Sequence, residues 1–127
     1  MIRFDDFAPT EGQPIYLQIL NYIKRGAVAG TIADGDELPS RRMLSARLGI
    51  NPNTVQKAFH LLEEEGLIES RTGAKSCMTL DEKKLERLKV EQLEGYVRSF
   101  AQSMKEMAIT RDEAQALLER FWDGEGK

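Results

Sequence analysis

Basic side chains gather in two stretches of the sequence that contain no acidic residue. The stretch from Leu38 to Lys57 carries four basic residues and the stretch from Ser70 to Thr79 carries two more, namely Arg41, Arg42, Arg47 and Lys57, then Arg71 and Lys75. The whole chain has 18 Lys plus Arg against 21 Asp plus Glu, a net charge of −3. Because guanidinium and ammonium groups bind phosphate oxygens through charge-assisted hydrogen bonds, this distribution indicates a local polyanion-binding surface that the net charge conceals.

Four polar residues of types that contact nucleic acid stand close together in the sequence, and they are Asn53, Thr54, Gln56 and Lys57. Asn and Gln form bidentate hydrogen bonds with adenine, Thr contacts a thymine methyl or a phosphate, and Lys supplies phosphate contacts. These residues begin a predicted helix, and the acidic residues 63–65 lie near the other end of that helix, where they would repel phosphate. We therefore expect the N-terminal end of this helix to face DNA.

The sequence contains no catalytic or metal-binding constellation. Its one histidine, His60, and its one cysteine, Cys77, do not form a nucleophile with an oriented base, and no phosphate-binding, dinucleotide-binding or zinc-protease motif is present. We interpret His60 as a surface or partly packed residue and Cys77 as a small apolar strand residue rather than a redox sensor. The chain is predicted not to be an enzyme and to need no metal and no cofactor.

The composition is that of an ordinary globular chain of one domain, or one small domain with an appendage. It has 127 residues, 41% of them hydrophobic, and the single cysteine excludes a framework of disulfides. The N-terminus lacks the features of a signal peptide, and no stretch approaches the roughly 18 apolar residues of a membrane span. We expect a cytoplasmic protein without a membrane partner.

Helical periodicity and Gly and Pro punctuation then define the elements that position the basic and polar residues. After an extended segment over residues 1–12, a helix is predicted from Pro14 to about Ala29, with a loop over residues 31–39. Ser40 is a good N-cap for a second helix, Arg41–Leu48, and Asn51 for a third that ends before Gly66. The order is helix, tight turn, helix.

Short segments bounded by turns follow Gly66, and they read LIESR, TGAKS and CMTL. Two short strands joined by a turn fit this pattern best. The order of helices and hairpin is that of a winged helix, which places its third helix in the major groove of DNA.

From Asp81 the sequence becomes charged and helical. A first apolar set repeats at heptad spacing, and it comprises Val90, Leu93, Val97, Phe100, Met104 and Met107. Thr110 and Glu113 form a capping box that begins a last helix, whose apolar face includes Leu117, Leu118, Phe121 and Trp122. We expect Phe121 and Trp122 to pack against the long preceding helix; a small-molecule pocket bordered by these two residues is the alternative.

Two runs carry a resemblance to a known family: PIYLQI at residues 14–19 and GDELPSRRMLSARLGINPNTVQKAFHLLEEEGLIESRTG at residues 35–73. With PSxR, NPNTV and EGLI in order, residues 1–80 closely resemble the N-terminal domain of GntR-type bacterial transcription regulators. Residues 81–127 are shorter than the ligand-binding domains of the larger subfamilies. The chain therefore resembles the short YtrA-type subfamily, whose C-terminal part is two helices used for dimerisation.

The resemblance implies a fold that is mainly α with a small β-hairpin. A winged helix-turn-helix domain over residues 1–80 would be followed by a two-helix dimerisation segment over residues 81–127. The ten apolar residues named above, from Val90 to Trp122, would then form the dimer interface. It also implies that Ser40, Arg41 and Arg42 lie near DNA, with Arg41 at a position that varies in the family, and that residues 53–57 begin the recognition helix. Each of these has a plain alternative as solvated polar surface.

The wing departs from the pattern of the family. Where a second glycine is usual, this chain reads Gly73, Ala74, Lys75 and Ser76. Because glycine permits a close backbone approach, its loss suggests that Lys75 touches phosphate with its side chain. We expect wing contacts from Arg71, Gly73 and Lys75; the alternative is a solvated hairpin tip.

The sequence therefore predicts a homodimeric, cytoplasmic transcription regulator, most simply a repressor, which binds a pseudo-palindromic double-stranded DNA operator. Two rivals remain: a winged helix used as a protein interaction module, and an RNA or architectural DNA binder without sequence preference. An unidentified small-molecule effector would have to bind at the C-terminal helices or between them and the winged helix.

Overall fold

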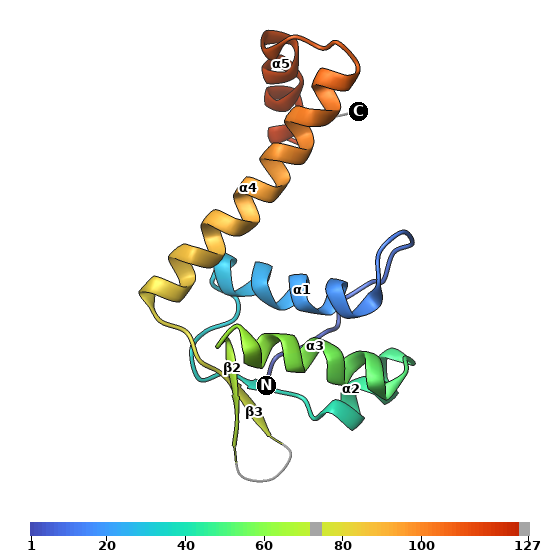
Figure 1. The fold of residues 1–127 in the computed structure, drawn as a ribbon, viewed down its shortest axis with the longest axis vertical. Helices are drawn as coiled ribbons and strands as arrows, with labels where there is room; N and C mark the ends of the chain where they lie inside the picture. Colours follow the sequence, from blue (N-terminus) through green and yellow to red (C-terminus); the bar gives the residue numbers. More distant parts are fainter. Residues whose placement is uncertain (72–74, 125–127) are drawn as a thin grey trace. The chain divides into compact units, whose positions relative to one another are not determined.

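The computed structural model describes residues 1–71 and 75–124 (Figure 1). It divides into two compact units, Met1–Lys89 and Val90–Lys127. The elements in chain order are α1 (Ile15–Ala29), β1 (Glu37–Leu38), α2 (Arg41–Leu48), α3 (Pro52–Glu64), β2 (Ile68–Ser70), β3 (Ser76–Met78), α4 (Glu82–Glu106) and α5 (Arg111–Trp122). This order confirms the mainly helical winged helix-turn-helix fold. The functional division after residue 80 stays a prediction, since the first two turns of α4 pack with the first unit.

The helix-turn-helix begins and ends where its capping residues predict. The Oγ atom of Ser40 accepts a hydrogen bond from the Met43 N–H at 3.1 Å, and the side-chain oxygen of Asn51 accepts one from the Asn53 N–H at 2.8 Å. Gly49 adopts φ 66°, a left-handed conformation that glycine permits at the C-terminus of α2. Pro14 differs slightly from expectation, because with φ −57° and ψ 140° it caps α1 rather than forming its first helical residue.

The sheet has three strands rather than the two expected from the sequence. Strand β1 lies within the predicted loop of residues 31–39, and the strand order is β1-β3-β2. Both pairings are antiparallel, with Glu37 opposite Cys77 and Ile68 opposite Met78. A strand of two residues has no measurable periodicity, so only its pairing with β3 reveals it. Its outer edge is held by the Ile2 N–H, which donates to the Glu37 carbonyl at 2.7 Å.

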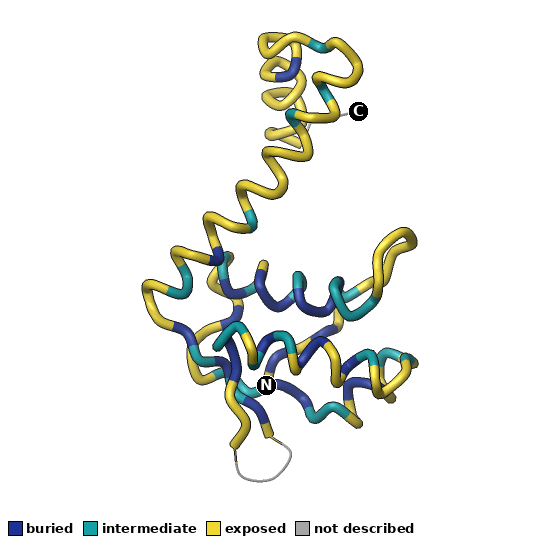
Figure 2. Tube along the Cα trace, viewed as in Figure 1, coloured by how far each residue is buried: buried dark blue, intermediate teal, exposed yellow. Residues whose placement is uncertain are grey.

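The core of the first unit lies between α1, α3 and the sheet (Figure 2). Helices α1 and α3 lie side by side and bury their apolar faces, with Ile19, Ile23 and Leu62 all at 0% exposure. Leu88, in the second turn of α4, is 1% exposed and belongs to the same core. At about 25 cal/mol per Å² of apolar surface, this burial is the main stabilising contribution to the unit.

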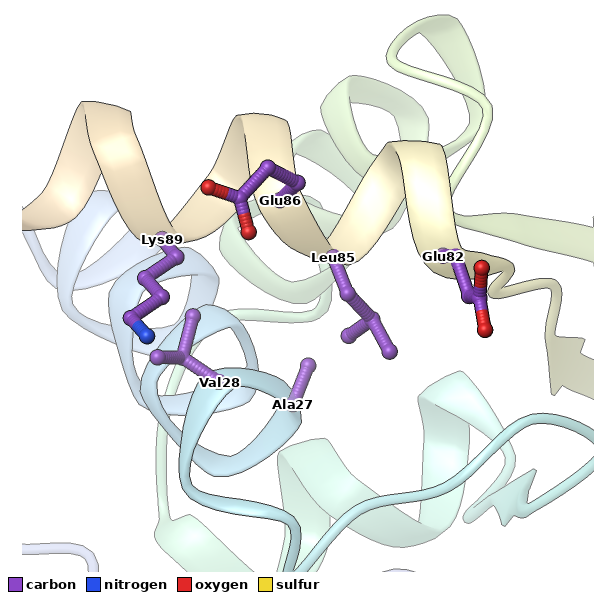
Figure 3. Close-up of a pocket in the computed structure, with 6 residues that line it drawn as sticks. All are labelled: Ala27, Val28, Glu82, Leu85, Glu86 and Lys89. Atoms are coloured by element: carbon purple, nitrogen blue, oxygen red, sulfur yellow. The ribbon is translucent and has the colours of Figure 1, made fainter.

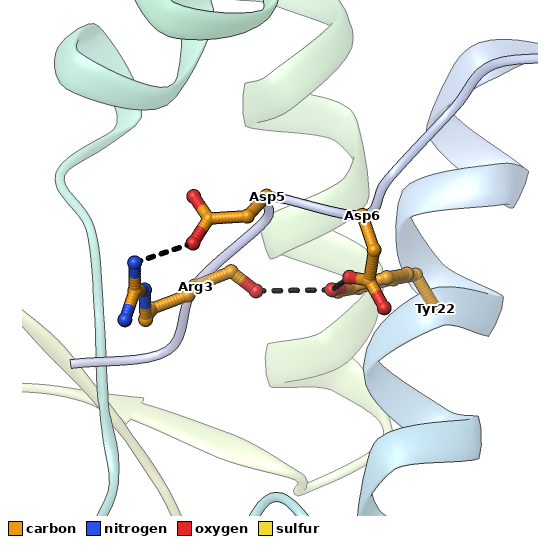
Figure 4. A network of polar contacts seen from close by, with 4 residues as sticks. All are labelled: Arg3, Asp5, Asp6 and Tyr22. Carbon is orange, nitrogen blue, oxygen red and sulfur yellow. Dashed lines mark hydrogen bonds and ion pairs between the residues drawn. The ribbon is translucent and has the colours of Figure 1, made fainter.

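Aromatic packing and one hydroxyl group fix the N-terminal segment to α1, and Figure 4 shows the contacts of this hydroxyl group. Phe4 stacks on Tyr22 with ring centroids 5.0 Å apart. The Tyr22 hydroxyl lies 3.0 Å from the Arg3 carbonyl oxygen and also contacts the Asp6 carboxylate. Burial, together with the hydrogen bond to Asp6, raises the pKa of Tyr22 to about 12. The phenol is therefore protonated at neutral pH and can donate to either oxygen.

The described part of the second unit consists of the rest of α4 and of α5. The Thr110 hydroxyl accepts from the Glu113 N–H at 3.2 Å, and the Glu113 carboxylate accepts from the Thr110 N–H at 3.1 Å. This reciprocal pair confirms the predicted capping box, and the hydrogen bond from the Thr110 backbone holds the pKa of Glu113 below its usual value. Among the described residues of this unit only Ala114 is buried.

Candidate nucleic-acid interface

The exposed face of α3 changes character along its length. Asn53 and Gln56 are exposed near its start, and their side chains make no hydrogen bond with any described residue. His60 lies one helical turn after Gln56, and Glu64 lies one turn after His60. The His60 Nε2 atom is 2.7 Å from the Glu64 carboxylate. Helical periodicity places Asn53, His60 and Glu64 on one face. The base-reading residue types thus lie at the end of the helix farthest from its carboxylates.

Lys57, expected to contact phosphate, packs on α1 instead of extending freely into solvent. Its Nζ atom lies 4.1 Å from the centroid of the Tyr16 ring, within the range of a cation–π interaction. Thr54 is half-buried one turn before it. Thr54 and Lys57 can both still approach a DNA backbone. To contact a phosphate, the Lys57 ammonium would either move away from the Tyr16 ring or bind the phosphate while it remains over the ring.

The two arginines at the start of α2 have different environments. Arg41 lies 2.9 Å from the Glu63 carboxylate, and its guanidinium carbon is 5.0 Å from the centroid of the Phe59 ring. Arg42 is exposed and has no hydrogen-bond or ion-pair partner among the described residues. Arg41 therefore links α2 to α3, whereas Arg42 presents a free guanidinium beside the N-cap Ser40.

The basic residues of the wing also have acidic neighbours. The Arg71 Nε atom lies 3.1 Å from the Glu69 carboxylate, and the Lys75 Nζ atom lies 3.6 Å from the Glu37 carboxylate. Both basic side chains are more than half exposed, so these pairs contribute little to stability and a phosphate can compete for them. Gly73 lies outside the described residues.

Sequence reasoning missed the acidic partners on this surface. Half of the basic residues singled out in the sequence, Arg41, Arg71 and Lys75, have a carboxylate within ion-pair distance. Glu63, the partner of Arg41, and Glu37, the partner of Lys75, are distant from them in the sequence. A count of charges along one segment therefore does not include these carboxylates. The proposed DNA contacts of the individual residues therefore stay predictions.

A second exposed surface lies on the other unit. Nine of the ten residues predicted for the dimer interface are more than a third exposed in the single chain, and they are Val90, Leu93, Val97, Phe100, Met107, Leu117, Leu118, Phe121 and Trp122. Met104 is half-buried. Such a concentration of uncovered apolar side chains is typical of a surface that binds a partner.

The first unit also contains a shallow groove between the end of α1 and the start of α4 (Figure 3). Its volume is about 450 Å³, and its lining combines apolar and charged side chains: Ala27, Val28, Glu82, Leu85, Glu86 and Lys89. Among the described residues, no group of His, Cys, Asp and Glu side chains has the geometry of a metal site. No helix formed by residues 1–71 and 75–124 is long and apolar enough to span a bilayer.

Comparisons with known proteins agree with this geometry. The family model described as bacterial regulatory proteins of the gntR family matches residues 15–75. The helix-turn-helix regulator YhcF of Bacillus subtilis is 35% identical over 88% of this chain and 93% of its own length. The transcriptional repressor YtrA of the same organism is 34% identical over 95% of this chain and 86% of its own length.

Solved structures show the same relationship. A GntR family transcriptional regulator from Listeria monocytogenes superposes with a TM-score of 0.79 at 31% identity, over 88% of this chain and 98% of its own. These relatives are transcription regulators rather than enzymes, and their family binds DNA through a winged helix-turn-helix domain. The expected kinship is confirmed: this chain belongs to the GntR family of bacterial regulatory proteins, among its short YtrA-type members.

Proposed function

We propose that the chain is a homodimeric repressor that binds a pseudo-palindromic operator with two winged helices, in the cytoplasm where the bacterial chromosome lies. The observation that carries this proposal is the uncovered apolar surface of the second unit, where nine of the ten residues predicted for the interface are exposed. A second copy is the occupant that fits best, because an interface of two-fold symmetry brings the same patch of both chains together.

The first unit supports the role in DNA reading. The side chains of Asn53, Gln56 and Arg42 are exposed and make no hydrogen bond or ion pair with a described residue, and no carboxylate occupies the first turn of α3 or of α2. A single unit with a handful of phosphate contacts would bind weakly, whereas two linked units gain the advantage of effective concentration. The start of α3 offers no apolar patch to a protein, which disfavours the rival protein interaction module.

The assignment as a repressor rests on kinship. YtrA, which is similar to this chain over nearly its whole length, is named a transcriptional repressor. A dimer bound across a promoter excludes polymerase without a further domain. A small-molecule effector is not required by this mechanism and stays a prediction.

Selection of DNA with the wild-type protein tests the proposal. Repeated selection from a random pool of duplexes should enrich a pseudo-palindrome, and the two half-sites should be about one helical turn apart or a multiple of that. Sedimentation at micromolar concentration should give the mass of two chains. Enrichment of no sequence would favour the non-specific nucleic-acid binder, and a monomer at that concentration would contradict the dimer.

A further inference from the structure

One ammonium group holds the base of the wing. Lys84 lies in the first turn of α4, and its Nζ atom donates to the carbonyl oxygen of Gly66 at 2.7 Å and to that of Thr79 at 3.1 Å. Gly66 stands between the end of α3 and β2, and Thr79 directly follows β3. The side chain of Lys84 therefore joins the end of the recognition helix to the base of both strands of the hairpin.

Packing of its own helix fixes the position of this ammonium group. The Lys84 N–H donates to the side-chain oxygen of Asp81 at 2.8 Å, which caps the start of α4. Leu88, one turn later, is 1% exposed, and Leu85 packs half-buried against the same core. The first two turns of α4 are thus part of the first unit and bring Lys84 to the wing in a defined orientation.

The end of α3 is a favourable environment for a cation. Carbonyl groups at a helix C-terminus carry partial negative charge, and the carbonyl of Gly66 continues this end. Two further cations gather there, because the Lys24 Nζ atom lies 2.8 Å from the Glu65 carboxylate and an Arg87 guanidinium nitrogen lies 3.5 Å from the Glu65 carbonyl oxygen. Lys84 differs from both, since only its contacts reach the β3 side of the hairpin.

We propose that Lys84 is a positioning residue for DNA reading, which sets the placement of the wing relative to the recognition helix. The inference rests on the proposed operator binding. Helix and wing can contact one duplex together only if their relative placement matches the groove, and a site held loosely loses this advantage even when each contact residue is present. Two of the three ammonium donors of Lys84 are already used on carbonyl oxygens, so its role is distinct from a phosphate contact.

The test compares Lys84→Met with Lys83→Met in the full-length dimer. Lys83 is the adjacent residue, is exposed, and has no partner among the described residues, so both variants lose one positive charge but only one loses the carbonyl contacts. The probe is the duplex selected with the wild-type protein, and a scrambled duplex of equal length and composition gives the non-specific affinity. Affinity for the selected duplex should fall roughly tenfold in Lys84→Met, as expected for lost hydrogen bonds to a charged group.

Two further readouts separate positioning from loss of folded protein or of a phosphate contact. Affinity for the scrambled duplex should stay within about twofold of wild type, and the salt dependence of binding should keep its slope, because no phosphate contact is removed. Stoichiometric titration gives the active fraction, so partial unfolding does not imitate the result. Lys83→Met should keep the wild-type ratio of specific to non-specific affinity.

A second variant keeps the proposal testable if Lys84→Met folds poorly. Lys84→Gln retains N–H donors without charge and should show an intermediate loss of specificity. Equal specificity ratios in the Lys83 and Lys84 variants, or a reduced salt slope in the Lys84 variants, would overturn the positioning role. Absence of any selected duplex with the wild-type protein would instead contradict the proposed function itself.

Discussion

The two units of this chain differ in how far their large apolar side chains are exposed. In Met1–Lys89 most of the large apolar side chains form a closed core, with Leu44 and Leu62 at 0% exposure. In Val90–Lys127 residues of the same kind remain outside, with Leu93 at 51% and Trp122 at 79%. Because burial of apolar surface is the main favourable contribution to folding, the first unit is expected to be stable by itself and the second only with a partner surface. This difference matches the proposed roles, in which the first unit reads DNA and the second unit forms the dimer.

Removal of the second unit gives the largest expected effect. A fragment of residues 1–89 retains Leu88 and Lys84, both of which belong to the first unit, whereas a fragment ending at Leu80 would lose them. We expect a monomer that melts cooperatively but binds the selected duplex about a hundredfold to ten-thousandfold more weakly than the full chain. Sedimentation and fluorescence anisotropy measure the two properties. Undiminished affinity in this fragment would show that the second unit contributes nothing to binding.

The same substitution in each unit tests the comparison directly. Phe59 is 1% exposed in the first core and Phe121 is 54% exposed in the second unit. Phe59→Ala should lower the free energy of unfolding by about 3–5 kcal/mol at every protein concentration. Phe121→Ala should weaken the dimer, and its melting temperature should depend on the protein concentration. Urea denaturation at two protein concentrations distinguishes them, and a similar, concentration-independent loss in both variants would refute the distinction.

A charge in the apolar surface should act on assembly alone. Phe100→Asp places an unpaired carboxylate where a second copy is expected to pack, and we expect at least a hundredfold weaker dimerisation, on the order of several kcal/mol. Gln102→Asp is the matched control, because it adds the same charge at an exposed position of the same helix. Analytical ultracentrifugation reports the dissociation constants. An intact micromolar dimer of Phe100→Asp would mean that this surface faces no partner.

Within the first unit, DNA binding should be separable from stability. Arg42 is exposed and unpartnered within the described chain, and the helix dipole gives a cation no stabilisation at the start of α2. Arg42→Ala should therefore keep or slightly raise the melting temperature while weakening operator binding roughly tenfold. Arg47→Ala removes the same charge at the other end of α2 and should have a smaller effect. A lower melting temperature with normal binding would make Arg42 a structural residue.

The smallest expected effect is a pH dependence confined to the first unit. The pKa of Tyr22 is raised to about 12 in the folded chain, from about 10 in an unfolded one, since burial and Asp6 both disfavour the phenolate. A raised pKa contributes stability that is present in full below pH about 10 and is lost as the pH rises towards about 12. Between pH about 10 and about 12, the free energy of unfolding of the 1–89 fragment should depend less on pH in the Tyr22→Phe variant than in the wild-type fragment. Equal slopes would show that the phenol titrates normally.

Much of the fold could be predicted because its signals are local. Ser40, Asn51, and Thr110 with Glu113 each define a helix start through hydrogen bonds that span two or three residues. The heptad spacing after Asp81 likewise places the apolar residues of α4 on one side without reference to any other element. Such patterns depend on the conformation of one segment only, which is why the helix boundaries agree so closely.

The sequence by itself therefore determined the helices, their caps and the positions of the basic and polar residues along the chain. Tertiary structure alone decided which charges are free. Strand β1 exists only because β3 pairs with it, the guanidinium of Arg41 finds Glu63 across 22 residues, and the ammonium of Lys84 reaches Gly66 across 18. These contacts depend on how separate elements pack, and packing brings together residues that no periodicity or local charge count relates.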